Sequence, residues 1–149
     1  MSLQQEIMTA LKAAMKAKDQ GALTALRAVK SAILLAQTES GAKEELTEEQ
    51  ELKILQKQVK QRRDSAAIYL EQGREDLAAP EIAEADVINQ FLPEAMSEDD
   101  IAKIVEDTIN KVGAEGMKDM GKVMGIVSKQ IGGQADGKTI STIVRQKLA

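Results

Sequence analysis

One stretch decides the fold class: residues 97–113 read SEDDIAKIVEDTINKVG. Ser97 is a preferred helix N-cap, and three acidic residues follow it in the first turn, where the helix dipole favours carboxylates. Apolar residues then recur at helical spacing, at Ile101, Ile104, Val105, Ile109 and Val112. Gly113 is a typical residue just beyond a helix C-terminus. The stretch therefore predicts one amphipathic α-helix.

The same signals recur along the rest of the chain. Six more helices are expected. Three precede residue 80: one capped by Ser2 that ends near 19–21, one over about 22–38, and a long one from Thr47 to Gly73 after a polar loop at 40–43. Three follow: one over 82–91 with Pro80 near its first turn, one over about 117–131, and one over 137–148 capped by Asp136. The apolar stripes expected for the first three are Leu3, Ile7, Leu11, Ala14 and Met15; Leu23, Leu26, Val29 and Ile33; and Leu52, Leu55, Val59, Ala66 and Leu70. No stretch sustains the period-two alternation of a strand. The sequence therefore predicts an all-α fold of seven helices.

The composition excludes most catalytic and metal chemistry. The chain has no Cys and no His, so it has no disulfide, no thiolate or imidazole metal site, and none of the usual nucleophile–base triads. We expect no cofactor, no metal and no catalytic residue. No apolar run approaches the roughly 20 residues of a membrane helix, and the N-terminus lacks the signal-peptide pattern. We therefore expect a cytoplasmic protein.

The chain is expected to fold as two domains. The segment Phe91-Leu92-Pro93-Glu94 predicts a joint between an N-terminal helical hairpin or bundle, residues 1–92, and a three-helix domain, residues 93–149. Although the net charge is −4, the C-terminal domain is uneven in charge. Residues 94–107 hold six acids and one lysine, whereas residues 111–147 hold seven basic and three acidic residues. One end of this domain is therefore basic.

Four motifs occur in order along the chain. They are Gly73-Arg74-Glu75-Asp76-Leu77, Phe91-Leu92-Pro93-Glu94, Asp119-Met120-Gly121-Lys122-Val123-Met124-Gly125 and Ala135-Asp136-Gly137-Lys138. Together they resemble the YqeY family of small bacterial proteins over essentially the whole chain. The C-terminal part of that family resembles the tail domain of the B subunit of the tRNA-dependent amidotransferase, a helical module that contacts tRNA. The resemblance implies a tRNA-related binding module without the catalytic part of that enzyme.

Two residues depart from the pattern expected for relatives. Gln134 stands where an Arg is expected in relatives; if that Arg contacts a phosphate, the contact is lost here. Pro80 interrupts a stretch that is expected to be one continuous helix in relatives.

Candidate RNA-binding residues lie on the last two expected helices. At helical spacing Lys118, Lys122 and Lys129 surround Gly125 on a face opposite the apolar stripe, and Lys138 and Arg145 share a face of the last helix. An ordinary solvated lysine face is the first alternative. A second is that Gly121 and Gly125 admit a closely packed helix. However, an exposed glycine within a helix costs about 1 kcal/mol relative to alanine. Close approach of a phosphate backbone would explain both the glycine and the charges around it.

A second basic cluster lies on the long third helix. Its members are Lys53, Lys57, Lys60, Arg62 and Arg63, with no acid between them. The alternatives are a solvated face balanced by the acids at 44–51 and an auxiliary RNA contact.

Residues 132–139, GGQADGKT, match the phosphate-loop pattern G-x-x-x-x-G-K-[ST]. A phosphate loop needs a buried strand before it and a parallel sheet around it. Because an amphipathic helix precedes this stretch, we interpret it as a turn between helices, with Asp136 as N-cap.

The function favoured by these observations is a non-catalytic module that binds tRNA, or an RNA–protein complex, through phosphates. The two aromatic residues, Tyr69 and Phe91, cannot form a base-stacking platform. One alternative is an amidotransferase-related activity or accessory subunit, a carbon–nitrogen ligase with glutamine as nitrogen donor. A second is a protein–protein adaptor that uses the long third helix. A protein partner or self-association stays open at this point.

Overall fold

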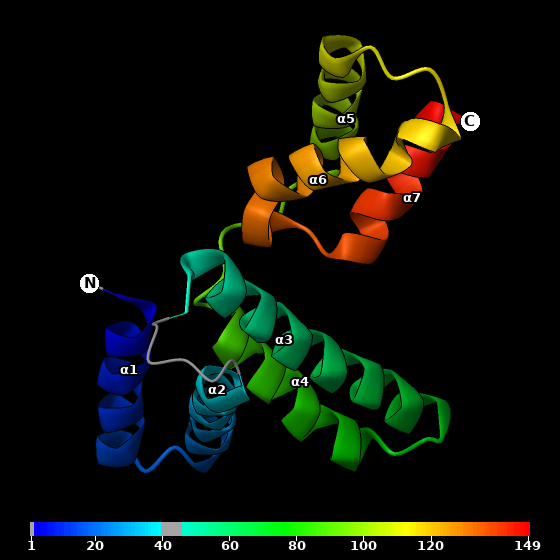
Figure 1. The fold of residues 1–149 in the computed structure, drawn as a ribbon. Helices are drawn as coiled ribbons and strands as arrows, with labels where there is room; N and C mark the ends of the chain where they lie inside the picture. Colours follow the sequence, from blue (N-terminus) through cyan, green and yellow to red (C-terminus); the bar gives the residue numbers. More distant parts are fainter. Residues whose placement is uncertain (1, 40–45) are drawn as a thin grey trace. The chain divides into compact units, whose positions relative to one another are not determined.

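The structure, a computed structural model, describes residues 2–39 and 46–149. These residues form the helices α1 (Leu3–Ala17), α2 (Gln20–Glu39), α3 (Glu48–Glu71), α4 (Glu75–Asn89), α5 (Glu98–Val112), α6 (Met120–Ile131) and α7 (Gly137–Leu148), with short 3₁₀ turns η1 (Met117–Asp119) and η2 (Gly132–Gln134) (Figure 1). No strand occurs in this described part, which confirms the predicted all-α fold. The loop expected at 40–43 lies outside the described residues. None of the described helices is long and apolar enough to cross a membrane.

Side-chain caps start five of the described helices, including α2, where the Asp19 carboxylate accepts a 3.1 Å hydrogen bond from the backbone N–H of Ala22. The Ser2 and Thr47 hydroxyls accept hydrogen bonds from the backbone N–H groups of Gln5 and Gln50, and both glutamines complete a capping box. Ser97 caps α5, and Asp136 caps α7 through a 2.7 Å bond from the Thr139 N–H. Because each cap satisfies an N–H group that the helix itself leaves unpaired, these starts follow from local sequence.

The structure divides into two compact units, residues 1–92 and 93–149. In the first unit α1 packs on α2, and α4 packs on both α2 and α3 (Figure 1). Leu26, Leu55 and Ile88 are among its fully buried core residues. Two residues expected in this core are instead exposed: Met15 by 56% and Leu70 by 50%. Both lie in the last turn of their helix, beyond the last buried residue of each stripe, Ala14 and Ala66.

Helix α4 corrects the expected helix over 82–91. It begins at Glu75 and continues through Pro80, so the interruption expected at Pro80 does not occur. Ala78 and Ala85 are each 1% exposed, one on either side of the proline, and their packing keeps the helix continuous. Proline costs α4 the hydrogen bond to the carbonyl of Asp76. Asp76 is exposed, so water can satisfy that carbonyl.

The second unit is a three-helix arrangement of α5, α6 and α7, each in contact with the other two. Its core is mainly valine and isoleucine; Val105, Val123, Val127 and Val144 are completely buried. The backbone N–H of Met96 donates to the carbonyl of Gln134 at 2.9 Å, which ties the segment before α5 to the turn after α6. The expected helix from 117 is an α-helix only from Met120, because residues 117–119 form η1.

Candidate nucleic-acid interface

The centre of the candidate site is the exposed face of α6. Lys122, Gly125 and Lys129 are all exposed, and their spacing of three and four residues places them on one side of the helix. The opposite side carries the buried Val123, Val127 and Ile131. The buried stripe therefore fixes the rotation of α6, and this rotation presents the two lysines and the glycine to solvent. We call these three residues the α6 face.

Gly125 lies in open space. A Cβ atom built on it would meet no atom within 4 Å, and the same holds for Gly121. The alternative in which these glycines admit a packed helix therefore has no neighbouring helix within the described residues. The glycine leaves the backbone of α6 accessible between two lysines.

Lys118 differs from the lysines of the α6 face. It lies in η1, so its direction does not follow from the α-helical spacing used to place it. Its ammonium is 3.5 Å from the Glu115 carboxylate, and both side chains are more than two-thirds exposed. Lys122 and Lys129 have no ion-pair partner among the described residues. Because exposed pairs contribute little free energy, Lys118 remains able to exchange Glu115 for a phosphate.

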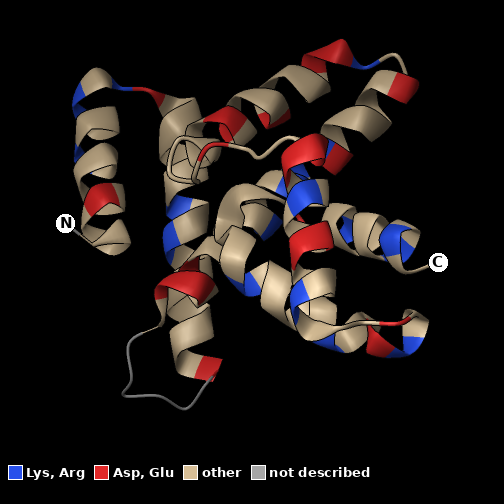
Figure 2. Cartoon of the chain, turned by 90° about the horizontal axis from the view of Figure 1, so that it is seen from above, with Lys and Arg blue, Asp and Glu red and all other residues tan. Residues whose placement is uncertain are grey.

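Helix α7 adds a second basic face. Lys138 and Arg145 are exposed seven residues apart, with the exposed Thr142 between them on the same side. Blue bands mark Lys and Arg on α7 towards the C-terminus (Figure 2). Lys147 has a different role: its ammonium is 2.6 Å from Glu106, and this pair ties the end of α7 to α5. The free charges of α7 among the described residues are therefore Lys138 and Arg145.

The Gln134 side chain also acts within the unit. Its amide nitrogen donates to the carbonyl of Glu94 at 3.4 Å. Together with the bond from Met96, this contact holds the entry to α5. The residue that departs from the expected Arg thus helps to shape the second unit.

The second basic cluster separates in the structure. Lys53 pairs with Glu49 at 3.5 Å and Lys60 with Asp64 at 3.0 Å, each along exposed α3. Lys57 and Arg63 are exposed and lack an ion pair within the described part of the chain. These four can meet solvent or a ligand, whereas Arg62 cannot.

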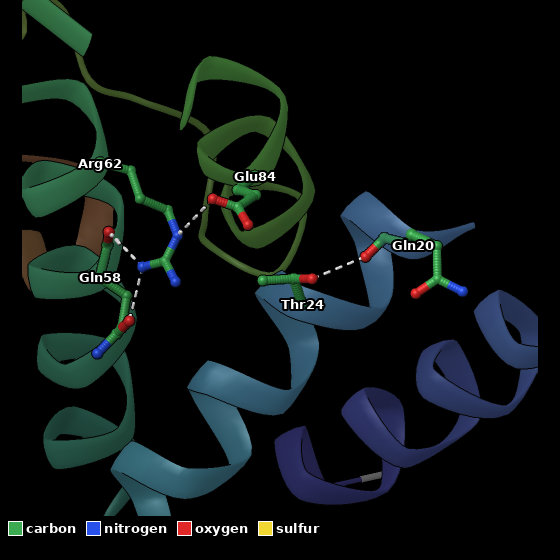
Figure 3. Close-up of polar contacts among 5 residues, drawn as sticks. All are labelled: Gln20, Thr24, Gln58, Arg62 and Glu84. Atoms are coloured by element: carbon green, nitrogen blue, oxygen red, sulfur yellow. Dashed lines mark hydrogen bonds and ion pairs between the residues drawn. The ribbon is translucent and has the colours of Figure 1, made fainter. Parts of the chain in front are cut away.

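Arg62 points from α3 towards α4 (Figure 3). Its side chain is only 13% exposed, and its Nε lies 3.7 Å from the carboxylate of Glu84, itself 15% exposed. One guanidinium nitrogen donates to the carbonyl oxygen of Gln58 at 3.1 Å and to its side-chain oxygen at 2.7 Å. Arg62 therefore stabilises the contact between α3 and α4 and does not face a phosphate.

Burial raises the pKa of the Glu84 carboxyl, Arg62 lowers it in part, and nearby Glu81 adds to the rise. Sequence reasoning did not identify Glu84. A signal was nevertheless present: Arg62 lies three residues after Val59 and four before Ala66, which is the spacing of the buried stripe. A charged residue at such a position requires a partner on the facing helix.

Comparison with known proteins supports the resemblance found in the sequence. A family model described as Yqey-like protein matches residues 4–148. The chain belongs to the Yqey-like protein family.

This Yqey-like chain is similar in sequence to two kinds of proteins. It is 36% identical over 124 residues to Altered inheritance of mitochondria protein 41, mitochondrial, of Clavispora lusitaniae, covering 81% of this chain and 69% of the relative. It is 33% identical over 73 residues, 46% of this chain, to a subunit of glutamyl-tRNA(Gln) amidotransferase from Thermococcus gammatolerans. In Methanococcus maripaludis the corresponding protein is 43% identical over 58 residues, 36% of this chain.

Coverage differs between these relatives. The matched stretches make up 12% and 9% of the two amidotransferase subunits, so most of each of them has no counterpart here. The fungal relative is named as mitochondrial. The cytoplasmic location expected for the Yqey-like chain therefore stays a prediction.

Proposed function

We propose that this protein binds RNA, with tRNA as the preferred class, through the α6 face and the basic residues of α7. The observation that carries the proposal is the exposed Gly125 between Lys122 and Lys129, with open space above it. A phosphate group can approach the helix backbone at the glycine and meet an ammonium on either side. Lys138 and Arg145 supply further charge on the neighbouring helix, and Lys118 joins when it releases Glu115.

The chemistry favours recognition of phosphate positions over bases. The chain has two aromatic residues, and Phe91 packs against the core of the first unit. Without an aromatic platform, single-stranded bases have no surface to stack on. Structured RNA presents phosphates at fixed separations, which rigid helices can match. Relatives named as subunits of a glutamyl-tRNA amidotransferase support tRNA among structured RNAs.

The test is tRNA binding by fluorescence anisotropy with the full chain, after removal of co-purified nucleic acid. Lys122→Glu/Lys129→Glu removes two attractions and adds two repulsions. The slope of log affinity against log salt should fall by about 0.7–0.9 for each lost phosphate contact. The control with the same charge change is Lys103→Glu/Lys111→Glu, two exposed lysines of α5, which should leave the affinity nearly unchanged. Equal loss in both variants would contradict a specific α6 face.

A second candidate function is supported by the names of the relatives. The chain shares sequence with a small part of amidotransferase subunits, so an accessory role in amidation of misacylated tRNA is consistent with the same RNA-binding face. The pure protein with glutamine, ATP and misacylated tRNA would test independent activity. Amidated product would establish the enzyme, and binding without product would favour the non-catalytic module.

A further inference from the structure

A hollow of about 120 Å³ lies between α1 and α2 in the first unit, and none of the residues that line it belongs to the proposed RNA site. Its lining is mostly apolar and includes Ile7, Met8, Ile33 and Leu34. Two of these are unusually open for such residues: Met8 is 38% exposed and Leu34 60%. Cavities of about 150 Å³ bind benzene-sized apolar groups, so this hollow has room for one aliphatic side chain.

The rim of the hollow is basic. Lys30 lines it directly, Lys12 lies one turn after Met8, and Arg27 lies on the same side of α2 as Lys30 and Leu34. All three are exposed, and none has an ion-pair partner among residues 2–39 and 46–149. We call the hollow and these three cations the α1/α2 groove. A matching surface would present one aliphatic side chain flanked by carboxylates.

The outer face of α4 has this composition. Glu75, Ala79, Ile82 and Asp86 follow one another at spacings of four, three and four residues, which places them on one side of the helix. All four are exposed, with Ile82 exposed by 43%. The buried Ala78 and Ala85 lie three or four residues from Ile82, so this exposed stripe borders the buried side of α4. We call this stripe the α4 face; its alanine allows close approach, Ile82 is the single bulky group, and an acid lies at either end.

We propose that the α4 face of one copy docks in the α1/α2 groove of a second copy. Ile82 would fill the hollow against Met8 and Leu34, and Asp86 and Glu75 would meet the unpaired cations of the rim. Within one chain both surfaces are exposed, so neither covers the other. In the proposed dimer the two contacts are related by a two-fold axis, which closes the pair.

The primary test is sedimentation velocity of the nuclease-treated full chain, up to about 1 mM protein. The expected result is reversible, concentration-dependent formation of a species of twice the 16.1 kDa chain mass. A monomer throughout this range would overturn the proposal. A mass that keeps growing with concentration would overturn the closed two-fold arrangement, because open head-to-tail contacts form chains.

A charge exchange tests the surfaces themselves. In its own dimer, the Lys30→Glu variant places a carboxylate opposite Asp86 at each of the two contacts. The Asp86→Lys variant likewise places an ammonium opposite Lys30. Each should raise the dimer dissociation constant by at least about tenfold. Mixed in equal amounts, the two variants should form a heterodimer at wild-type strength, because both contacts then join opposite charges.

Matched controls carry the same charge changes elsewhere. Lys103→Glu and Asp107→Lys, both exposed on α5, should dimerise like the wild type alone and in mixture. Leu34→Asp and Ile82→Asp should abolish dimerisation with unchanged helix content by circular dichroism, because both side chains are already exposed. Failure of the mixture to restore pairing would refute the docking of α4 in the groove, whatever tRNA binding shows.

Discussion

Replacement of Gly125 by alanine tests the structural basis of the α6 face. Gly125 lies in the middle of α6, and an added Cβ would meet nothing within 4 Å. The added methyl group therefore makes no steric clash in the folded state, whereas the unfolded chain loses the extra conformational freedom of glycine. We expect Gly125→Ala to raise the unfolding free energy of the second unit by about 0.5–1 kcal/mol.

Hydrogen exchange of the α6 amides in the full chain measures this gain locally. An increase of about 0.5–1 kcal/mol slows exchange through opening of the second unit by roughly two- to fivefold. Gly113→Ala is the matched control, because Gly113 ends α5 at a φ of +67° that disfavours any side chain. That variant should lose at least about 1 kcal/mol. If Gly125→Ala also destabilised the unit, the open space assigned to Gly125 would be wrong.

A larger side chain at the same position separates stability from binding. Gly125→Leu leaves every charge in place and fills the space between Lys122 and Lys129. We expect weaker tRNA binding with an unchanged salt slope, and a stability equal to or above that of the wild type. A packed neighbour would instead give overpacking, with a loss of about 1–3 kcal/mol. A destabilised protein with intact tRNA affinity would refute the phosphate-approach explanation of the glycine.

Three further predictions concern the folding of the two units. Asp136→Ala should lower the unfolding free energy by about 1 kcal/mol in chemical denaturation, because the Thr139 N–H loses its cap. Thr142→Ala, which leaves that cap in place, is the comparison. Because burial raises the pKa of Glu84, the folded state binds more protons than the unfolded state between the two carboxyl pKa values, so stability falls as pH rises through that interval. Glu84→Gln should flatten this dependence, whereas Arg62→Leu should steepen it and cost about 1–3 kcal/mol at pH 7; equal pH profiles for all three proteins would contradict the assignment. Limited proteolysis should cut first at residues 92–97, and first cleavage inside α3 would count against a joint there.

Local signals were sufficient for most helix starts. Ser97 and Asp136 cap the helices that they predict, because a side-chain acceptor three residues before an unpaired N–H is a short-range feature. The start of α4 was harder, since Arg74 makes no side-chain cap and Pro80 resembles a first-turn residue. Packing of Ala78 and Ala85 decided that helix, and a single sequence does not show which alanines become buried.

For the charged residues too, the sequence predicts local spacing but not tertiary contacts. Periodicity places Lys122, Gly125 and Lys129 on one side of a helix, but whether that side meets solvent or another helix depends on tertiary packing. In the sequence alone, Lys147 and Arg62 are basic residues that nothing distinguishes from Lys122 and Lys129. Their acidic partners, Glu106 and Glu84, lie on other helices, 41 and 22 residues away. Long-range ion pairs of this kind determine which cations remain available to a ligand.

The two proposals combine into one consequence for RNA binding. A dimer formed through the first units carries two α6 faces, and a long structured RNA that reaches both binds the second at a raised effective concentration. Monomeric Ile82→Asp should then lose affinity for such an RNA but retain the wild-type affinity for a hairpin that spans a single face. Lys122→Glu/Lys129→Glu should weaken both. Equal affinities of the monomeric variant and the wild type for the long RNA would show that the paired units act independently, even if both surfaces exist.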